Sequence, residues 1–274
     1  MVPGPPRRPR RGPGVSGFLD EMDAASRRRV PSTVDTPRPA PSLILEGFDV
    51  IAEIKLRAPS AGRLAMPPSD RAGFVTARAQ AYARAGAAAI SVLTEPTRFD
   101  GALADLETAT AAVDVPVMRK DFLVDPVQVA EAAAAGAGGV LLIARMLSDD
   151  VLDACLTSAS DAGLFVLLEA FDAEDLSRSA TRADAWPAGA PPLLVGVNTR
   201  DLSTLQVDPD RLGALSAHLP RSVPCVAESG LRTPQDAARV VGMGYRLALV
   251  GSALMASEHP GALLAAMIAA GREA

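Results

Sequence analysis

The chain has 274 residues, of which 49% are hydrophobic and 22% are charged, a balance typical of a globular protein with a large core. Its formal net charge of −5 gives no basic field for nucleic acid, and its apolar runs are too short for a membrane span. The two cysteines and two histidines form no metal-ligand cluster, so the sequence predicts no metal site and a reducing, cytoplasmic location.

The first 41 residues differ in composition from the rest of the chain, because they hold nine prolines and eight arginines. Such a segment buries too little apolar area to order itself well, so we expect a partly disordered extension, with residues 1–15 disordered. Within it, Phe18 and Met22 recur at helical spacing and predict a short helix over residues 17–29. Residues 42–274 are expected to form one catalytic domain.

Short strand-like runs recur through that domain and alternate with alanine-rich helical segments. The runs begin near residues 49, 88, 116, 139, 164, 193, 223 and 247. Helices are predicted between them, for example over residues 72–85, 127–135 and 235–241. Eight strand–helix units in about 225 residues predict an α/β fold of the (β/α)₈ TIM barrel type. A doubly wound open sheet is the alternative, but even repetition without a second domain favours closure.

Polar side chains stand at the carboxyl ends of five of these strands, where barrel enzymes carry their active sites. Alternate residues of a strand share one face, so a polar residue two positions after an inward apolar one also points inward. On this parity, one cavity receives Glu53, Lys55, Lys120, Glu169, Asn198 and Glu228.

Each of these residues taken alone has an ordinary structural explanation. Glu53 and Lys55 could form an ion pair that closes the barrel, Lys120 could be a solvated loop charge, and Asn198 could be a turn residue. Convergence of all six on one rim favours a single site. Desolvated lysines and carboxylates have shifted pKa values suited to acid–base chemistry, so these residues are candidate catalytic groups.

The last two strands end in small residues instead, with Ser229-Gly230 after the seventh and Gly251-Ser252 after the eighth. Barrel enzymes often bind phosphate at this place through backbone N–H groups. We therefore predict a phosphorylated small-molecule substrate whose reactive part lies over Lys120 and Glu169.

Several segments together resemble the indole-3-glycerol phosphate synthase family. They are IAEIKLRAPSAG, SVLTEPTRFDG, the long block that begins VPVMRKDF, LEAFD, GVNTRDL, VAESGLRTPQD and ALVGSALM. The matching segments occur in order from about residue 48 to the C-terminus and are distributed over all four quarters of the predicted barrel.

The resemblance implies ring closure of 1-(2-carboxyphenylamino)-1-deoxyribulose 5-phosphate with loss of CO₂ and water, without a cofactor, by a cytoplasmic monomer. It implies Lys120 as general acid, Glu169 as general base and Lys55 as the contact for the substrate carboxylate. Glu53 and Asn198 would orient the lysines and the substrate hydroxyls, with Glu228 at the same rim. The implied substrate- and phosphate-binding residues are Ser60, Phe99, Phe122, Ser229, Gly230, Gly251 and Ser252.

The sequence departs from the family pattern at a few positions. Ala58 stands where the family usually has serine, Thr199 where a second asparagine is usual, and Pro96-Thr97 where charged residues are usual. The N-terminal segment is also shorter and richer in proline. These departures raise the hypothesis of a duplicate enzyme in a specialised indole pathway.

Three other functions compete with this interpretation. A phosphoribosylanthranilate isomerase would carry a cysteine at the end of the first strand, where this chain has Glu53-Ile54-Lys55. A Schiff-base aldolase would also use a strand-end lysine. A non-catalytic barrel is the least favoured, because all the predicted acid–base positions are filled.

Overall fold

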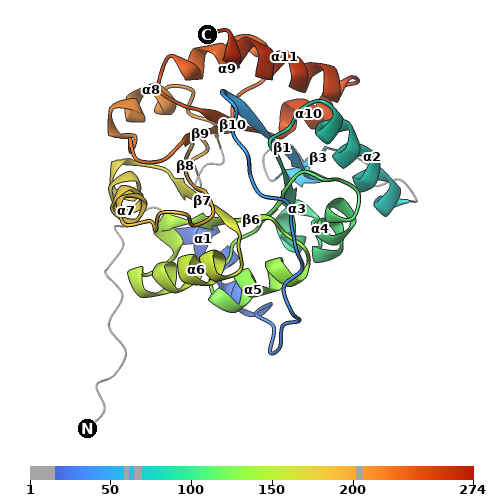
Figure 1. Cartoon of the computed structure of the whole chain (residues 1–274), viewed down its shortest axis with the longest axis vertical. Helices are drawn as coiled ribbons and strands as arrows, with labels where there is room; N and C mark the ends of the chain where they lie inside the picture. Colours follow the sequence, from blue (N-terminus) through green and yellow to red (C-terminus); the bar gives the residue numbers. More distant parts are fainter. Residues whose placement is uncertain (1–15, 59–61, 65–69, 202–205) are drawn as a thin grey trace.

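Eight parallel strands close into a barrel in the order β1-β10-β9-β8-β7-β6-β5-β4 in the computed structural model (Figure 1). The predicted TIM barrel is therefore confirmed. The strands are β1 Asp49–Ile54, β4 Ala89–Leu93, β5 Val117–Lys120, β6 Gly139–Ile143, β7 Phe165–Ala170, β8 Leu193–Asn198, β9 Cys225–Glu228 and β10 Leu247–Val250. The structure describes residues 16–58, 62–64, 70–201 and 206–274, so the disorder predicted for residues 1–15 lies outside the described residues.

Helices cover the outside of the barrel and connect its strands. They are α1 Ser16–Arg27, α2 Arg71–Arg84, α3 Pro96–Phe99, α4 Leu103–Thr110, α5 Pro126–Ala134, α6 Asp149–Asp161, α7 Ala173–Asp184, α8 Arg211–Leu215, α9 Pro234–Val241, α10 Ser252–Ala256 and α11 Pro260–Arg272. Local sequence sets their ends: Asp125 caps α5 and Thr233 caps α9. Within the described residues, no helix is both long and apolar enough to cross a bilayer.

The strands are buried on both faces, because side chains fill the barrel on one side and meet the helices on the other. Every residue of β1, β7 and β8 is buried. This double burial explains why the strands read as near-continuous runs of Val, Ile and Leu. Acidic residues within these runs, such as Glu53 and Glu169, therefore need partners inside the barrel.

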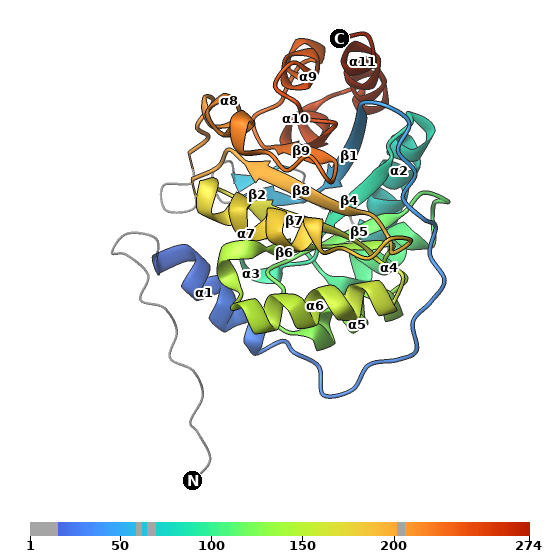
Figure 2. The ribbon, with the colours of Figure 1, turned by 60° about the vertical axis from the view of Figure 1, so that its left-hand side comes forward.

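The part of the N-terminal segment that the structure describes begins with a helix that packs against the barrel. Figure 2 shows α1 beside the barrel and the following chain running along the molecule before it enters β1. Helix α1 overlaps the helix predicted over residues 17–29, and its residues Leu19 and Met22 are fully buried. After β1, a short antiparallel pair of strands, β2 Arg57–Ala58 and β3 Gly62–Arg63, begins the first loop above the barrel.

Candidate active site

A cavity of about 140 Å³ opens at the carboxyl ends of the barrel strands. Of the predicted site residues, eleven line it: Glu53, Lys55, Phe99, Lys120, Phe122, Glu169, Asn198, Ser229, Gly230, Gly251 and Ser252. They come from seven of the strands or from the segments that follow them, so strand parity and closure of the barrel bring together groups far apart in sequence. Ser60 lies outside the described residues.

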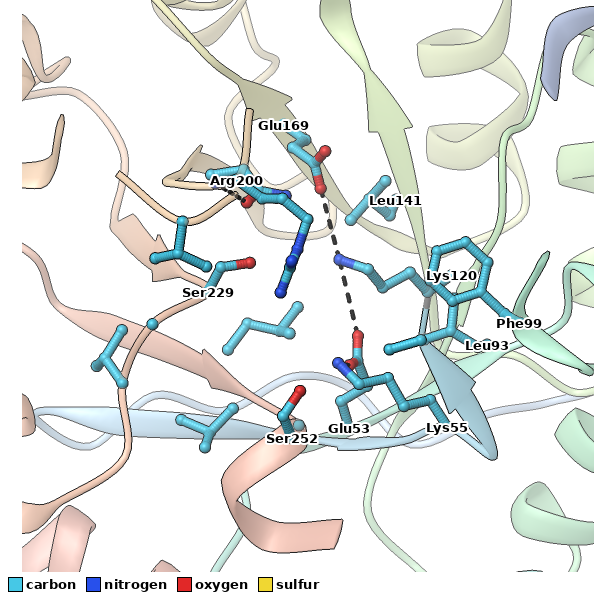
Figure 3. A pocket seen from close by; sticks show the side chains of 18 of the residues that line it. Glu53, Lys55, Leu93, Phe99, Lys120, Leu141, Glu169, Arg200, Ser229 and Ser252 are labelled. Carbon is cyan, nitrogen blue, oxygen red and sulfur yellow. Dashed lines mark hydrogen bonds and ion pairs between the residues drawn. The ribbon is translucent and has the colours of Figure 1, made fainter. Parts of the chain in front are cut away.

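Lys120 occupies the centre of a set of carboxylates. Its Nζ atom lies 3.2 Å from Glu228 Oε2, 3.4 Å from Glu169 Oε2 and 3.8 Å from Glu53 Oε2. Figure 3 shows the ammonium between Glu169 on one side and Glu53 on the other. Burial alone would lower the pKa of Lys120, but the surrounding carboxylates outweigh it and raise the pKa above the ordinary lysine value. Lys120 is therefore an ammonium across the neutral pH range.

Glu53 bridges the two lysines of the chain, because its Oε1 atom lies 2.6 Å from Lys55 Nζ while Oε2 faces Lys120. Burial would raise the pKa of Glu53, but Lys55 and Lys120 outweigh it and lower the pKa below the ordinary value. The ion pair that the sequence offers as a structural alternative is thus present. It also belongs to the cavity, since both residues line it.

Glu228 lies beneath this network and does not line the cavity. Its side chain is fully buried, and its Oε1 atom has no hydrogen-bond partner among the described residues. Burial raises the pKa of Glu228 to about 8, the negative charge of Glu169 adds to the rise, and Lys120 opposes it. Glu228 thus contacts Lys120 from the buried side of the network, with 3.2 Å between Nζ and Oε2.

The opposite side of the cavity is formed by the ends of β9 and β10. Ser229 and Gly230 both have left-handed backbones, with φ angles of 67° and 83°. A serine in this region is strained, and such strain is often found at functional sites. Together with Gly251 and Ser252, these residues form the small-residue rim predicted to hold phosphate.

Aromatic rings form the remaining wall. The ring centroid of Phe122 lies 5.8 Å from that of Phe18 in an edge-to-face contact, and 6.1 Å from that of Phe99. Phe99 ends α3, whose first N–H groups donate to the buried carboxylate of Glu95. Phe18 was not predicted, because nothing in the local sequence indicates that α1 lies beside the cavity.

Asp121 fastens α1 to the barrel next to Lys120. Arg29, which follows α1, donates from both terminal guanidinium nitrogens to the two oxygens of Asp121 at 2.8 Å each. Thr94 donates to the same carboxylate at 2.7 Å, and the side chain of Asp121 is wholly buried. The position of Phe18 over the cavity thus depends on a contact that joins the N-terminal segment to β5.

We expect Arg29→Ala to lower the free energy of unfolding by about 1–3 kcal/mol and to raise KM, because it leaves a buried carboxylate short of a partner and frees Phe18. Chemical denaturation and steady-state kinetics measure the two effects. Arg27→Ala is the matched control, since Arg27 pairs with Asp23 on the helix surface and such pairs contribute about 0–1 kcal/mol. Equal effects of the two variants would contradict this role for Arg29.

Two further cationic side chains, which the sequence pattern did not predict as site residues, line the cavity. Arg200 follows Asn198 by two positions, so extending the alternation of β8 by one step would have indicated it. Its backbone N–H donates to Asn198 Oδ1 at 2.9 Å, and its side chain points into the cavity in Figure 3. Arg232, on the loop after β9, adds charge at the mouth. With Lys55 and Lys120, the cavity presents four cations to a multiply anionic ligand.

The comparisons with known proteins identify a family for this chain. The model of the family described as indole-3-glycerol phosphate synthase matches residues 32–267. The chain belongs to that family. A relative of this name from Nocardioides sp. is 45% identical over 252 residues, covering 90% of this chain and 92% of the relative. Another from Parafrankia sp. is 43% identical over 249 residues, covering 90% of this chain and 88% of the relative.

Solved structures outside this family share the fold. A 3-hexulose-6-phosphate synthase from Salmonella typhimurium is 13% identical with a TM-score of 0.61, over 82% of this chain and 99% of that chain. A phosphoribosyl anthranilate isomerase from Thermotoga maritima is 14% identical with a TM-score of 0.54, over 82% of this chain and all of that chain. At this identity the likeness concerns the barrel alone.

The departures from the indole-3-glycerol phosphate synthase pattern fall around the cavity. Ala58 lines it and is almost fully buried, so the hydroxyl usual in the family is missing from the wall itself. Thr199 is buried, and the Thr199 Oγ1 atom donates to the backbone oxygen of Glu228 at 3.2 Å. Pro96 opens α3, the short helix that carries Phe99. The predicted acid and base, Lys120 and Glu169, both line the cavity.

Proposed function

We propose that the protein is an indole-3-glycerol phosphate synthase, a carbon–carbon lyase of tryptophan or specialised indole biosynthesis. It would convert 1-(2-carboxyphenylamino)-1-deoxyribulose 5-phosphate into indole-3-glycerol phosphate, CO₂ and water. The observation that carries this proposal is Lys120, held as an ammonium by Glu53, Glu169 and Glu228 at the base of a cavity with an aromatic wall. Membership of the family supports the same reaction.

In this proposal Lys120 is the general acid of ring closure. As the ring carbon bonds to the ribulose carbonyl carbon, the carbonyl oxygen gains negative charge and takes a proton from the ammonium. The bond from the ring carbon to its carboxylate then breaks, CO₂ leaves, and the aromatic ring is restored. In the later dehydration Glu169 is the general base that takes a proton from the neighbouring CH₂ carbon, while the departing hydroxyl takes a proton from a lysine ammonium of the cavity and leaves as water. The contact of Glu169 with Lys120, 3.4 Å between Nζ and Oε2, places acid and base side by side for these successive steps.

The other cavity residues bind and orient the substrate. Lys55 would contact the anthranilate carboxylate, with Glu53 and Asn198 fixing the positions of the lysines and substrate hydroxyls. The phosphate would lie at the rim of Ser229, Gly230, Gly251 and Ser252, and we retain Ser60 as a proposed substrate-binding residue. Phe99 and Phe122 would cover the aromatic ring. Four cations around the cavity attract a substrate that bears a carboxylate and a phosphate.

A Schiff-base mechanism fits the geometry less well, because imine formation requires a neutral amine. The carboxylates around Lys120 favour its charged form and so disfavour that chemistry. From membership of the family, we also propose that the enzyme acts as a monomer in the cytoplasm.

The direct test is incubation of the purified protein with the carboxyphenylamino deoxyribulose phosphate while indole fluorescence is followed. We expect fluorescence to rise without any added metal or cofactor, with release of one CO₂ for each indole formed. Absence of product from correctly folded protein would contradict the proposed function. Reduction with borohydride in the presence of substrate should leave both lysines unmodified, whereas a covalent lysine adduct would favour the aldolase.

Restoring the missing hydroxyl tests the family comparison at Ala58. Because Ala58 lines the cavity, Ala58→Ser places a hydrogen-bond donor on its wall. We expect KM to fall by about fivefold with kcat nearly unchanged, since one hydrogen bond to a charged group contributes about 1–3 kcal/mol and part of that is offset by desolvation. Steady-state kinetics measures both constants, and an unchanged KM would show that the position is neutral.

A further inference from the structure

Gly196 lies in the middle of β8, where the backbone conformation does not require glycine. Its φ angle does not lie in the left-handed region, where glycine is favoured over other residues. Glycine within a strand weakens it, and often marks a place where another group approaches the backbone closely. Gly196 does not line the cavity, so it is not a substrate contact either.

The group that approaches is the carboxyl of Glu228. A Cβ atom built on Gly196 would lie 2.0 Å from Glu228 Oε1 and 3.0 Å from Leu167 Cδ1. In the barrel register, Gly196 pairs with Glu169 on β7 and with Val226 on β9, while Glu228 pairs with Asn198. The carboxyl of Glu228 therefore leans back over β8, through the space that a side chain at position 196 would fill, towards Glu169.

This direction of the Glu228 side chain explains how Glu228 and Glu169 both contact Lys120. They belong to strands separated by β8, and their Oε2 atoms lie 3.2 Å and 3.4 Å from the same Nζ atom. A methyl group at position 196 would overlap Glu228 Oε1 and push that carboxyl off its place. The raised pKa of Glu228, caused by burial and by the neighbouring charge of Glu169, agrees with such close packing.

We propose that Gly196 is a positioning residue of the active site: its missing side chain seats Glu228 across β8 and so completes the carboxylate set on Lys120. The role acts through Glu228 and requires no contact with substrate. Gly251 shows the same relation to Glu53, since a Cβ there would lie 2.2 Å from Glu53 Oε1. Because Gly251 also lines the cavity, a substitution there would affect substrate binding as well. A substitution at Gly196 tests the positioning role by itself.

A double-mutant cycle tests this proposal with Gly196→Ala, Glu228→Ala and the variant that carries both. The kinetic arm rests on the proposed function. Gly196→Ala should lower kcat by about 100-fold in the wild-type background, with little change in KM, because misplacing a catalytic group by about 1 Å can cost that much. In the Glu228→Ala background it should cost less than about threefold, because the group it displaces is gone. Gly213→Ala is the matched control, since its nearest contact would be Met243 Cε at 3.8 Å.

A second readout needs no turnover. The chain has two lysines, so ¹³Cε-lysine labelling yields two signals and the titration of Lys120 can be followed directly. Gly196→Ala should lower the pKa of Lys120 by about one pH unit, since an opposing charge is moved away, and should have no effect once Glu228 is alanine. Equal losses in both backgrounds, or an unchanged Lys120 titration, would overturn the proposal.

The same set of variants distinguishes a folding defect from a loss of activity. If Gly196→Ala alone fails to fold, the double variant should regain a cooperative thermal transition, because Glu228→Ala vacates the space; failure to regain it would overturn the proposal. An inactive wild-type protein would contradict only the proposed function, and the lysine titration would then decide the role of Gly196.

Discussion

Lys120→Ala is expected to lower kcat by about 1,000-fold while KM changes far less, because general acid catalysis typically contributes 10²–10⁴-fold. The side chain lies within 4 Å of three carboxylates, so its removal takes away both the proton donor and the charge that holds them together. Stopped-flow and steady-state assays of indole formation measure the loss.

Two further measurements make this result specific to the acid. Lys120→Arg keeps a positive charge but barely releases protons, so it should remain nearly as slow as the alanine variant. Added methylamine should partly restore turnover to Lys120→Ala and leave wild type unaffected. Near-normal kcat in the alanine variant would show that another group donates the proton.

Glu169→Gln is expected to lower kcat by about 100-fold or more, because the amide keeps the shape of the side chain but cannot accept a proton. The step affected is the dehydration, so a dehydration-deficient enzyme should still release CO₂ and accumulate an intermediate before indole appears. Rapid quench followed by product analysis distinguishes this pattern from a uniform loss.

Glu174→Gln is the control for that substitution. Glu174 follows Glu169 by five positions, at the start of α7, and is exposed to solvent, so the same chemical change there should leave kcat unaltered. If Glu169→Gln retained normal kcat, or if CO₂ release and indole formation slowed equally, the assignment of Glu169 to dehydration would be wrong.

The barrel could be predicted because its information is local. Each buried strand is a run of apolar residues, each helix start carries a cap such as Thr233, and alternation within a strand decides which side chains point inward. The placement of Glu53, Lys120 and Glu169 in one cavity followed from that alternation together with closure of the sheet.

The parts that escaped prediction depend on contacts between distant segments. Phe18 reaches the cavity on α1, which is held in place by long-range contacts such as that of Arg29 with Asp121, 92 positions along the chain. Arg200 was passed over because the alternation continues into the loop after β8 has formally ended. The place of Glu228 below the cavity depends on the space left at Gly196 on the neighbouring strand.

The amino-acid sequence by itself determined the closed barrel, the parity of its strands and the acid–base residue types at their carboxyl ends, because periodicity and chain order carry that information. The tertiary structure alone decided which charges meet. Burial would lower the pKa of Lys120, whereas three nearby carboxylates raise it. The balance depends on ångström-scale distances among four strands, and those distances exist only in the packed barrel.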